Sequence, residues 1–222
     1  MPIRYWTIWT YGVGMVRMAD HERRRTEIAA AAVDIARQEG LGRVTIAAVA
    51  ARSGVSVGLV QHYFPGKDLL VHRAYAELLS SMERRVAAIV DVGERREESI
   101  RTMCTTALTS FLPVPENRRD CLARAEFQVL AARSEALAAV AREDDRALRG
   151  RLRGVVANAR LCGEVAPEAD EVAVADELWA AVLGAAAVML VDPTYPGEAV
   201  LAEATRRAFP RPCRRHEETP AD

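Results

Sequence analysis

Residues 54–64 read GVSVGLVQHYF, and PGKDLL follows at 65–70. Ser56 is a good N-cap, with Val57, Val60 and Phe64 spaced to form the inward face of a helix. Pro65-Gly66 ends that helix after about two turns. The remaining positions carry an amide, an imidazole and a phenol, so the stretch predicts a short capped helix with a polar outward face.

A second helix precedes this one, with Thr45 as its expected N-cap and Gly54 at its end. A longer helix is expected further upstream, from an N-cap at Asp20 to Gly40. Two helices joined by a short glycine-containing turn, the second of them short, form a helix-turn-helix. The second helix of such a unit lies in the major groove of DNA.

The rest of the chain is predicted to be helical as well. Aromatic residues make up only 5% of the sequence, alanine is abundant, and strand-like alternation is hard to find. We expect an all-α fold of about nine helices, in which a long fourth helix joins a three-helix N-terminal domain to a C-terminal helical bundle. The later helices are expected at 95–112, 117–132, 135–161, 168–191 and 197–208.

Four segments follow from this pattern. Residues 1–19 are expected to be a disordered extension, with an ordered arm as the alternative. The helix-turn-helix domain is predicted at 20–66 and a ligand-binding and dimerisation domain at 67–209. Residues 210–222 form a C-terminal tail.

Charge is distributed unevenly along the chain, although the formal net charge is only −1. Residues 21–75 contain eight Arg or Lys and five Asp or Glu, hence +3, whereas 76–222 contain twenty and twenty-five, hence −5. The basic character therefore coincides with the helix-turn-helix, as a polyanionic partner requires.

Several functional classes have little support in the sequence. The four cysteines lack CxxC or histidine spacing, which favours free thiols in a reducing compartment over a metal site, and no cofactor is expected. The longest uncharged apolar run, 178–191, has fourteen residues, fewer than a bilayer requires, so a cytoplasmic protein is expected. No phosphate loop, nucleophile elbow or metalloprotease motif is present, and an enzyme is not expected.

Individual side chains on the short helix have clear chemical options. Gln61 can offer a bidentate amide to an adenine edge. Hydroxyl, imidazole, phenol and ammonium groups can hold phosphates, and they are supplied by Thr45, Ser56, His62, Tyr63 and Lys67, the only lysine in the chain. Taken singly, Tyr63 and Phe64 fit core residues better and His62 an ordinary surface residue, and only the arrangement as a whole favours DNA contact.

The stretch TIAAVAARSGVSVGLVQHYFPGKDLL at 45–70 closely resembles the DNA-binding domain of the TetR/AcrR family of transcriptional repressors. The resemblance implies that Thr45 caps the second helix against a phosphate and that Val57, Gly58 and Gln61 face base edges. It also implies that His62, Tyr63 and Lys67 hold the backbone. Many relatives have a polar or basic residue at the position of Val57, and valine can offer only apolar contact, for example to a thymine methyl.

The remainder is similar, more weakly, to the betaine-regulator-like branch of that family. This similarity implies a bundle that holds a small-molecule effector and forms homodimers through its last two long helices. The predicted pocket residues are Met103, Phe111, Arg124, Phe127, Gln128, Asn158 and Trp179.

The residues themselves also favour a dimer, because 178–191 is apolar on all faces. The predicted interface comprises Leu178, Val182, Ala185, Met189, Val200, Leu201, Ala204 and Ala208. The function expected is that of a repressor released from a palindromic DNA operator by a small molecule. An effector-independent DNA-binding protein is the alternative, and a helical-bundle enzyme a more distant one.

Overall fold

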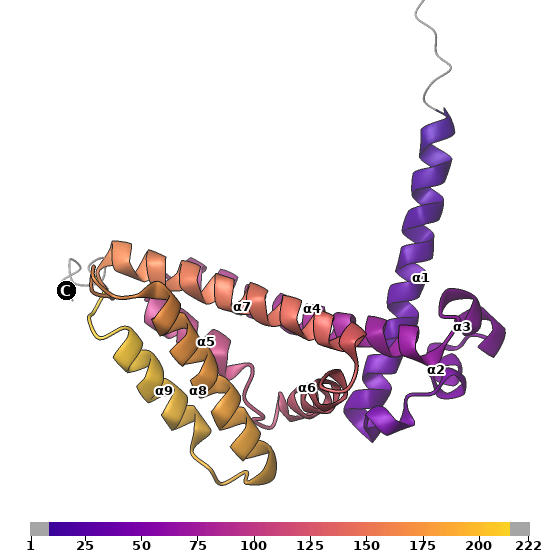
Figure 1. Ribbon diagram of the computed structural model, residues 1–222. Helices are drawn as coiled ribbons and strands as arrows, with labels where there is room; N and C mark the ends of the chain where they lie inside the picture. Colours follow the sequence, from indigo (N-terminus) through magenta and orange to yellow (C-terminus); the bar gives the residue numbers. More distant parts are fainter. Residues whose placement is uncertain (1–8, 214–222) are drawn as a thin grey trace, which may run out of the picture. The chain divides into compact units, whose positions relative to one another are not determined.

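The computed structural model describes the backbone of residues 9–213 and the side chains of residues 20–213. Within that part it contains nine α-helices, one 3-10 turn and no strand, which confirms the all-helical prediction (Figure 1). The chain divides into two compact units, residues 1–77 and 78–222.

The first unit contains the helix-turn-helix. It comprises α1 (Trp9–Glu39), the 3-10 turn η1 (Leu41–Arg43), α2 (Ile46–Ser53), α3 (Val57–Tyr63) and the first turns of α4 (Lys67–Arg95). Thr45 and Ser56 cap α2 and α3 as predicted, by accepting the backbone N–H groups of Ala48 and Leu59. Gly54 ends α2 in the left-handed conformation, with φ 68°.

The start of α1 differs from the prediction. The helix begins at Trp9, so residues 9–19 of the expected extension are helical, while residues 1–8 lie outside the described part. Asp20 is therefore not an N-cap, and its carboxylate instead accepts a hydrogen bond from Arg23 within the helix at 2.5 Å. An acidic residue followed by a basic one at i+3 suits a helix interior as well as its start.

The boundary between the two compact units falls at residue 77, within α4. The first turns of α4 belong to the first unit because Arg73 fastens them to α1. Its guanidinium lies 2.7 Å from Glu22 and donates to the Thr26 hydroxyl at 2.9 Å. Leu70 and Tyr75 on the same turns are almost fully buried.

The second unit contains the rest of α4 and five further helices. These are α5 (Ile100–Thr109), α6 (Arg118–Ala131), α7 (Glu135–Cys162), α8 (Glu171–Val191) and α9 (Gly197–Ala208). Helix α5 is shorter than expected, because a turn at 96–98 precedes Ser99, whose side chain caps the helix. The predicted bounds of α9 are confirmed. Of the predicted tail, residues 210–213 follow α9 without helical structure, and 214–222 lie outside the described part.

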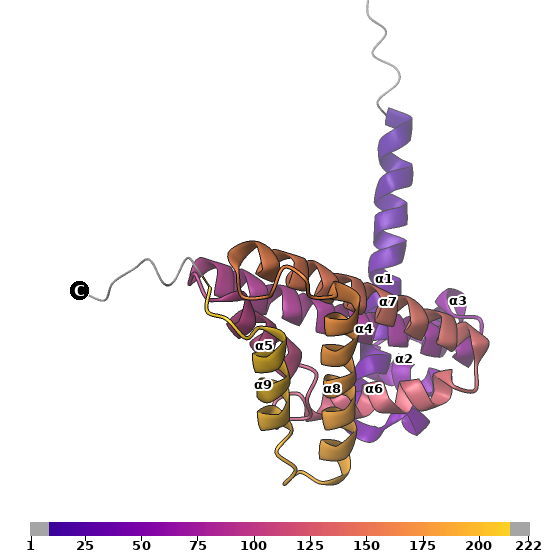
Figure 2. The same ribbon diagram turned by 60° about the vertical axis from the view of Figure 1, so that its left-hand side comes forward.

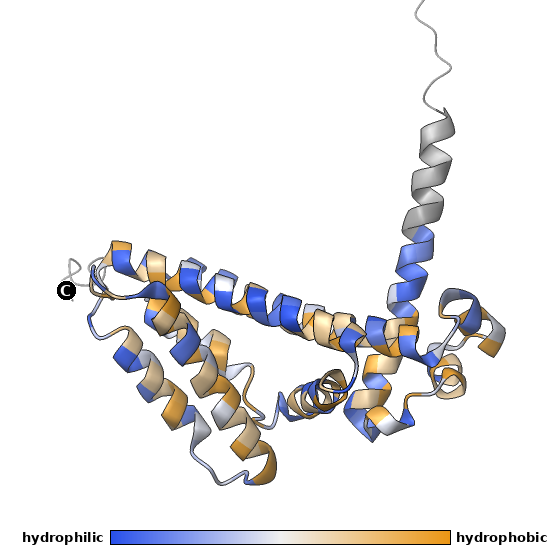
Figure 3. Cartoon of the chain, in the orientation of Figure 1, coloured by the Kyte–Doolittle hydropathy of each residue, from blue (hydrophilic) through white to orange (hydrophobic). Residues whose placement is uncertain are grey.

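Helices α8 and α9 lie side by side (Figures 1 and 2). Hydrophobic residues occupy most of the length of α8 (Figure 3). By length and composition alone α8 could cross a membrane, but 33% of its most apolar window is buried inside the chain. Its last carbonyls, at Met189 and Leu190, accept hydrogen bonds from Arg118 at 3.2 and 3.0 Å, which ties α8 to α6.

The turn between α2 and α3 allows a direct test. Gly54→Ala should lower the free energy of unfolding by roughly 1–2 kcal/mol, because a Cβ disfavours the left-handed conformation. Gly58→Ala is the matched control: a Cβ at either glycine meets no atom within 4 Å, but only Gly54 has a positive φ. Urea unfolding of both variants gives the comparison. Equal stability of Gly54→Ala and wild type would contradict the assigned turn.

Candidate nucleic-acid interface and ligand pocket

Helix α3 presents a polar face to solvent and an apolar face to the core. Val60 and Phe64 are fully buried, whereas Gln61 and His62 are exposed. Val57 is 44% exposed, so it belongs to the outward tip of the helix and not to the predicted inward face. Gly58 is exposed beside it, and a backbone without a side chain there can approach a ligand closely. The exposed tip matches the arrangement expected for base contact.

Tyr63 is half-buried and belongs to a small cluster of rings. Its ring centroid lies 4.7 Å from that of His21 on α1 and 5.3 Å from that of His62. His21 was not among the predicted residues, since no spacing rule connects residues 21 and 63. Together these contacts position the Tyr63 phenol at the edge of α3.

Thr45 and Ser56 each use the side-chain oxygen as an acceptor for their own helix, at 3.1 Å. Both residues are exposed, so each hydroxyl retains its hydrogen for donation to another acceptor. A phosphate oxygen is such an acceptor. Capping and backbone contact are therefore compatible at both positions.

Lys67 differs from most arginines in the described part of the same unit. It is exposed at the first position of α4 and makes no ion pair with any residue from 20 to 213. Arg52, by contrast, pairs with Glu39 at 2.7 Å. An exposed, unpaired ammonium beside a helix N-terminus suits an anion, because the first backbone N–H groups of the helix lack intrahelical acceptors.

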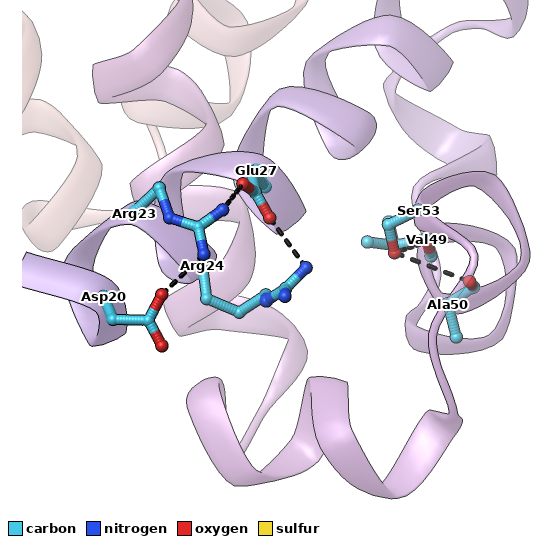
Figure 4. A network of polar contacts seen from close by, with 7 residues as sticks. All are labelled: Asp20, Arg23, Arg24, Glu27, Val49, Ala50 and Ser53. Atoms are coloured by element: carbon cyan, nitrogen blue, oxygen red, sulfur yellow. Dashed lines mark hydrogen bonds and ion pairs between the residues drawn. The ribbon is translucent and has the colours of Figure 1, made fainter. Parts of the chain in front are cut away.

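Two arginines near the start of the described part of α1, Arg23 and Arg24, are paired within the helix (Figure 4). Arg23 bridges Asp20 and Glu27, both at 2.5 Å, and Arg24 lies 2.8 Å from Glu27. Hydrogen bonding and charge from Arg23 lower the pKa of Asp20, and Asp20 in turn raises the pKa of Arg23. These solvent-exposed pairs reduce the positive charge that α1 can offer to another anion.

Figure 4 also shows the end of α2. The Ser53 hydroxyl donates to the Val49 carbonyl at 2.6 Å and lies 3.4 Å from that of Ala50. These bonds add to the backbone bond from the Val55 N–H, which the Ala50 carbonyl accepts at 3.0 Å. The end of α2, and with it the turn to α3, is held by side-chain and backbone bonds together.

The second unit contains a cavity of about 750 Å³. Its walls come from α4, α5, α7 and α8 and are mainly apolar. The lining residues include Val86, Val90, Met103, Leu108, Phe111, Leu152, Val155 and Trp179. A cavity of this size and character is typical of sites for small organic molecules.

Charged groups gather on part of the wall. Glu83, Asp91 and Glu94 from α4 line the cavity together with one basic residue, Arg151. Arg151 lies 2.7 Å from Glu83, which neutralises both groups. Asp91 also pairs, with Arg95 on the next turn. The remaining charge on the wall is negative, an environment that favours a cation over an anion.

Four of the seven predicted pocket residues line the cavity: Met103, Phe111, Asn158 and Trp179. The other three do not. Phe127 is fully buried core, and Gln128 is exposed on α6. Helical spacing placed both on α6 correctly, but it did not show that this helix contributes no lining residue. The prediction also omitted the part of the wall that α4 forms. The only signal of that part in the sequence is the apolar stripe along the helix.

Arg124 lies behind the cavity wall and supports it. Its guanidinium carbon sits 5.6 Å from the ring centroid of Phe111 and 5.3 Å from that of Trp179. It also lies 3.4 Å from Asp144, with both side chains almost fully buried. Burial raises the pKa of Asp144, and the charge of Arg124 opposes that rise. Arg124 therefore stiffens the aromatic wall and is not itself a lining residue.

Trp179 is fixed from two sides. Its indole N–H donates to Asp145 at 2.6 Å, and the Phe111 ring meets it edge to face with centroids 5.3 Å apart. With its polar atom satisfied, the indole offers an apolar surface to the cavity.

The predicted dimer residues require correction. Leu178, Val182, Ala185, Met189 and Leu201 are at most 7% exposed, and they pack inside the single chain. They cannot also supply the surface of an interface. The other three residues of the set lie at the surface, with Val200 36% exposed and Ala204 and Ala208 partly exposed. The apolar pattern of α8 does not indicate which of its faces the chain itself covers.

An exposed seven-residue helix behind a tight turn, with a capped helix before it, is the geometry of a helix-turn-helix DNA-binding protein. The family profile described as bacterial regulatory proteins of the tetR family matches residues 28–74. The profile described as BetI-type transcriptional repressor, C-terminal, matches residues 100–211, half of the chain. The chain belongs to the TetR family of bacterial transcriptional regulators, with a C-terminal domain of the BetI type.

Individual relatives agree with this assignment. The HTH-type transcriptional regulator BetI 1 of Chromohalobacter salexigens is 31% identical over 112 residues, which cover 44% of this chain and 55% of that protein. The matched part thus spans about half the length of this curated relative. Because members of the family are DNA-binding regulators, the expectation of a non-enzymatic protein is confirmed.

Solved structures support the same fold. A transcriptional regulator from Rhodococcus sp. Rha1 is 28% identical, with a TM-score of 0.67 over 84% of this chain and 94% of that one. A transcriptional regulator from Saccharomonospora viridis, solved in complex with choline, has a TM-score of 0.64 over 86% and 98% at 15% identity. The second likeness concerns the fold alone.

The two kinds of DNA contact can be separated experimentally. Lys67→Ala should weaken binding to all duplexes alike and reduce the slope of log affinity against log salt by about one unit, because one phosphate contact is lost. Gln61→Ala should leave that slope unchanged and cost about 1–3 kcal/mol only on the preferred sequence. Fluorescence anisotropy on selected and scrambled duplexes measures both. Loss of sequence preference in Lys67→Ala, or an unchanged preference in Gln61→Ala, would contradict the assigned roles.

Proposed function

We propose that this chain is a repressor that binds a palindromic operator as a homodimer and is released from it by a small molecule. The observation that carries the proposal is the cavity of about 750 Å³ walled by α4, the same helix that begins at Lys67. Residues 83–94 of this helix contribute to the cavity wall. A ligand that shifts this wall can therefore move the residue that holds a phosphate.

Release follows from the geometry of a two-fold site. Both α3 helices of a dimer must fit half-sites about 34–36 Å apart, or a multiple of that distance. A ligand that binds more tightly to a dimer whose α3 helices are a different distance apart favours that dimer form, and the affinity for the operator falls. An effector-independent DNA-binding protein would leave the cavity without a role.

The homodimer is proposed to form through the exposed face of α8 together with α9. Val188 and Val191 are 43% and 88% exposed, and Val200 on α9 is 36% exposed. Ala180, Gly184 and Ala187 lie exposed on the same face of α8. Small residues in that stripe allow the helix of a second copy to approach closely, as in an isologous four-helix interface.

This interface predicts the oligomeric state of two variants and the unfolding of a third. Val188→Glu should give a folded monomer, because a carboxylate at the interface would be buried without a partner. Val129→Glu is the control, since Val129 is 62% exposed on α6, and it should remain a dimer. Ala185→Glu should unfold the bundle, because Ala185 is core.

Light scattering reports the mass of each variant, and circular dichroism reports its folding. A dimeric Val188→Glu, or a wild-type monomer at micromolar concentration, would place the interface elsewhere.

The effector is proposed to be an organic cation with an apolar body. The wall charge is negative, and the choline complex of the Saccharomonospora viridis regulator shows a cationic ligand bound by a protein of this fold. The Arg124 guanidinium already lies over the rings of Phe111 and Trp179. For a cationic ligand, the carboxylates of α4 are therefore more accessible than those two rings.

The corresponding experiment uses DNA selected from a random pool. Choline or a bulkier quaternary ammonium ion should release the protein from that DNA, and dimethylbutanol, the neutral isostere of choline, should not. Glu94→Gln should weaken the response about tenfold, the effect of losing one charge contact of about 1.4 kcal/mol. Release by the neutral compound alone would refute a cationic effector. Failure of every compound tested, with DNA binding intact, would favour the effector-independent alternative.

A further inference from the structure

Two cysteines and a glutamate meet at the end of the bundle. Cys162 is the last residue of α7, Glu164 follows in the next turn, and Cys213 lies after α9. The two sulfur atoms and a carboxylate oxygen lie within 4.8 Å of one another. All four cysteines of the chain are free thiols. This cluster, Cys162-Glu164-Cys213, has no part in the DNA interface and does not line the cavity.

The fold brings these residues together by specific bonds. Gly163 adopts φ 90° and reverses the chain at the end of α7. The carbonyl of Glu164 then accepts the backbone N–H of Arg211 at 3.3 Å. Phe209 is fully buried, and its carbonyl lies 3.4 Å from the Arg101 guanidinium. The segment that carries Cys213 is thus fastened beside the end of α7.

Glu164 already has a structural role. Its two oxygens accept the backbone N–H groups of Ile100 and Arg101, each at 2.9 Å, at the start of α5. These bonds account for a carboxylate that is only 1% exposed. A metal ion would have to compete with both of them, whereas a bond between the two thiols would leave them intact. The geometry therefore favours sulfur–sulfur chemistry over metal binding.

We propose that Cys162 and Cys213 form an intrachain disulfide when the protein reacts with a hydroperoxide. In the first step the Cys162 sulfur attacks the peroxide oxygen, which gives a sulfenic acid and releases an alcohol, or water when the oxidant is hydrogen peroxide. In the second step the Cys213 sulfur attacks the sulfenic sulfur and expels water. Two thiols are oxidised, and one peroxide is reduced.

The surroundings assign an order to the two cysteines. Cys162 is partly exposed, whereas Cys213 is 6% exposed, so the oxidant reaches Cys162 first. The Cys162 thiol donates to a Glu164 oxygen at 3.4 Å. Burial raises the pKa of Cys162 to about 11, so the thiol stays protonated at rest. Cys104 and Cys121 are both buried, so the oxidant has less access to them than to Cys162.

The disulfide would close a ring around the last two helices. The segment 162–213 contains all of α8 and α9, so the bond would restrict this hairpin in the unfolded chain and raise the melting temperature of the oxidised protein. Glu164 also holds the first turn of α5, which lines the cavity. The oxidised cluster would therefore adjoin a cavity-lining helix.

The test treats the full chain with hydrogen peroxide, blocks residual thiols with N-ethylmaleimide and maps the peptides by mass spectrometry. The expected product is a chain with no covalent link to another chain. Before blocking it is lighter by two hydrogen atoms, and the peptides of Cys162 and Cys213 are joined. Cys162→Ser and Cys213→Ser should each abolish the joined peptide. Cys104→Ser and Cys121→Ser are the matched controls and should keep it.

Three results would overturn the proposal: a sulfinic acid on Cys162 with Cys213 still free, joined peptides only between different chains, or a different intrachain pair. Purified protein that contains stoichiometric zinc, lost in Cys213→Ser, would identify the cluster as a metal site instead. If a serine variant does not fold, peptide mapping of the oxidised wild type still decides.

Discussion

Helix α3 has seven residues, too few to be stable in water without tertiary packing. Its conformation depends on the burial of Val60 and Phe64 in the first unit, with Gly54 supplying the turn and Ser56 the cap. Because these inward residues fix the rotation of the helix, they also fix which residues face outward. The polar face of Gln61 and His62 is thus a consequence of core packing, and base contact depends on it.

The apolar residues of α8, in the second unit, lie in three different environments. One face of α8 packs into the bundle through Leu178, Val182 and Ala185. Trp179 contributes to the cavity wall, and Val188 and Val191 remain exposed. A soluble monomer has little reason to keep such an exposed stripe. The proposed interface and the proposed effector site are therefore adjacent on one helix, which offers a physical route from ligand to dimer geometry.

The sequence predicted the elements well where local chemistry determines them. The caps at Thr45 and Ser56, the stop at Gly54 and the bounds of α9 depend on residues within one or two turns, and all were confirmed. The start of α1 was missed because Asp20 is a residue type that favours the N-cap position, and no stronger helix-start signal comes before it. Contacts between distant residues also escape local patterns: Arg73 ties α4 to α1 across 47 residues.

Site residues were predictable to the extent that they lie on one short helix. The exposure of Gln61 was predictable because α3 has only one exposed face, and Lys67 is exposed at the start of α4. The pocket requires four helices to converge, and helical periodicity cannot choose among the inward residues of each. It identified Phe111 and Trp179 but assigned Phe127 to the same cavity, although that side chain is core. The Cys162-Glu164-Cys213 cluster joins residues 51 positions apart, a proximity that only the fold creates.

The central claim is that α3 and the residues around it contact DNA. Hydrogen–deuterium exchange of the full chain, with and without duplex selected from a random pool, tests it most directly. The account predicts slower exchange at residues 45–67 in the presence of DNA, with smaller changes elsewhere. Protection confined to residues 100–211, with 45–67 unchanged, would contradict it.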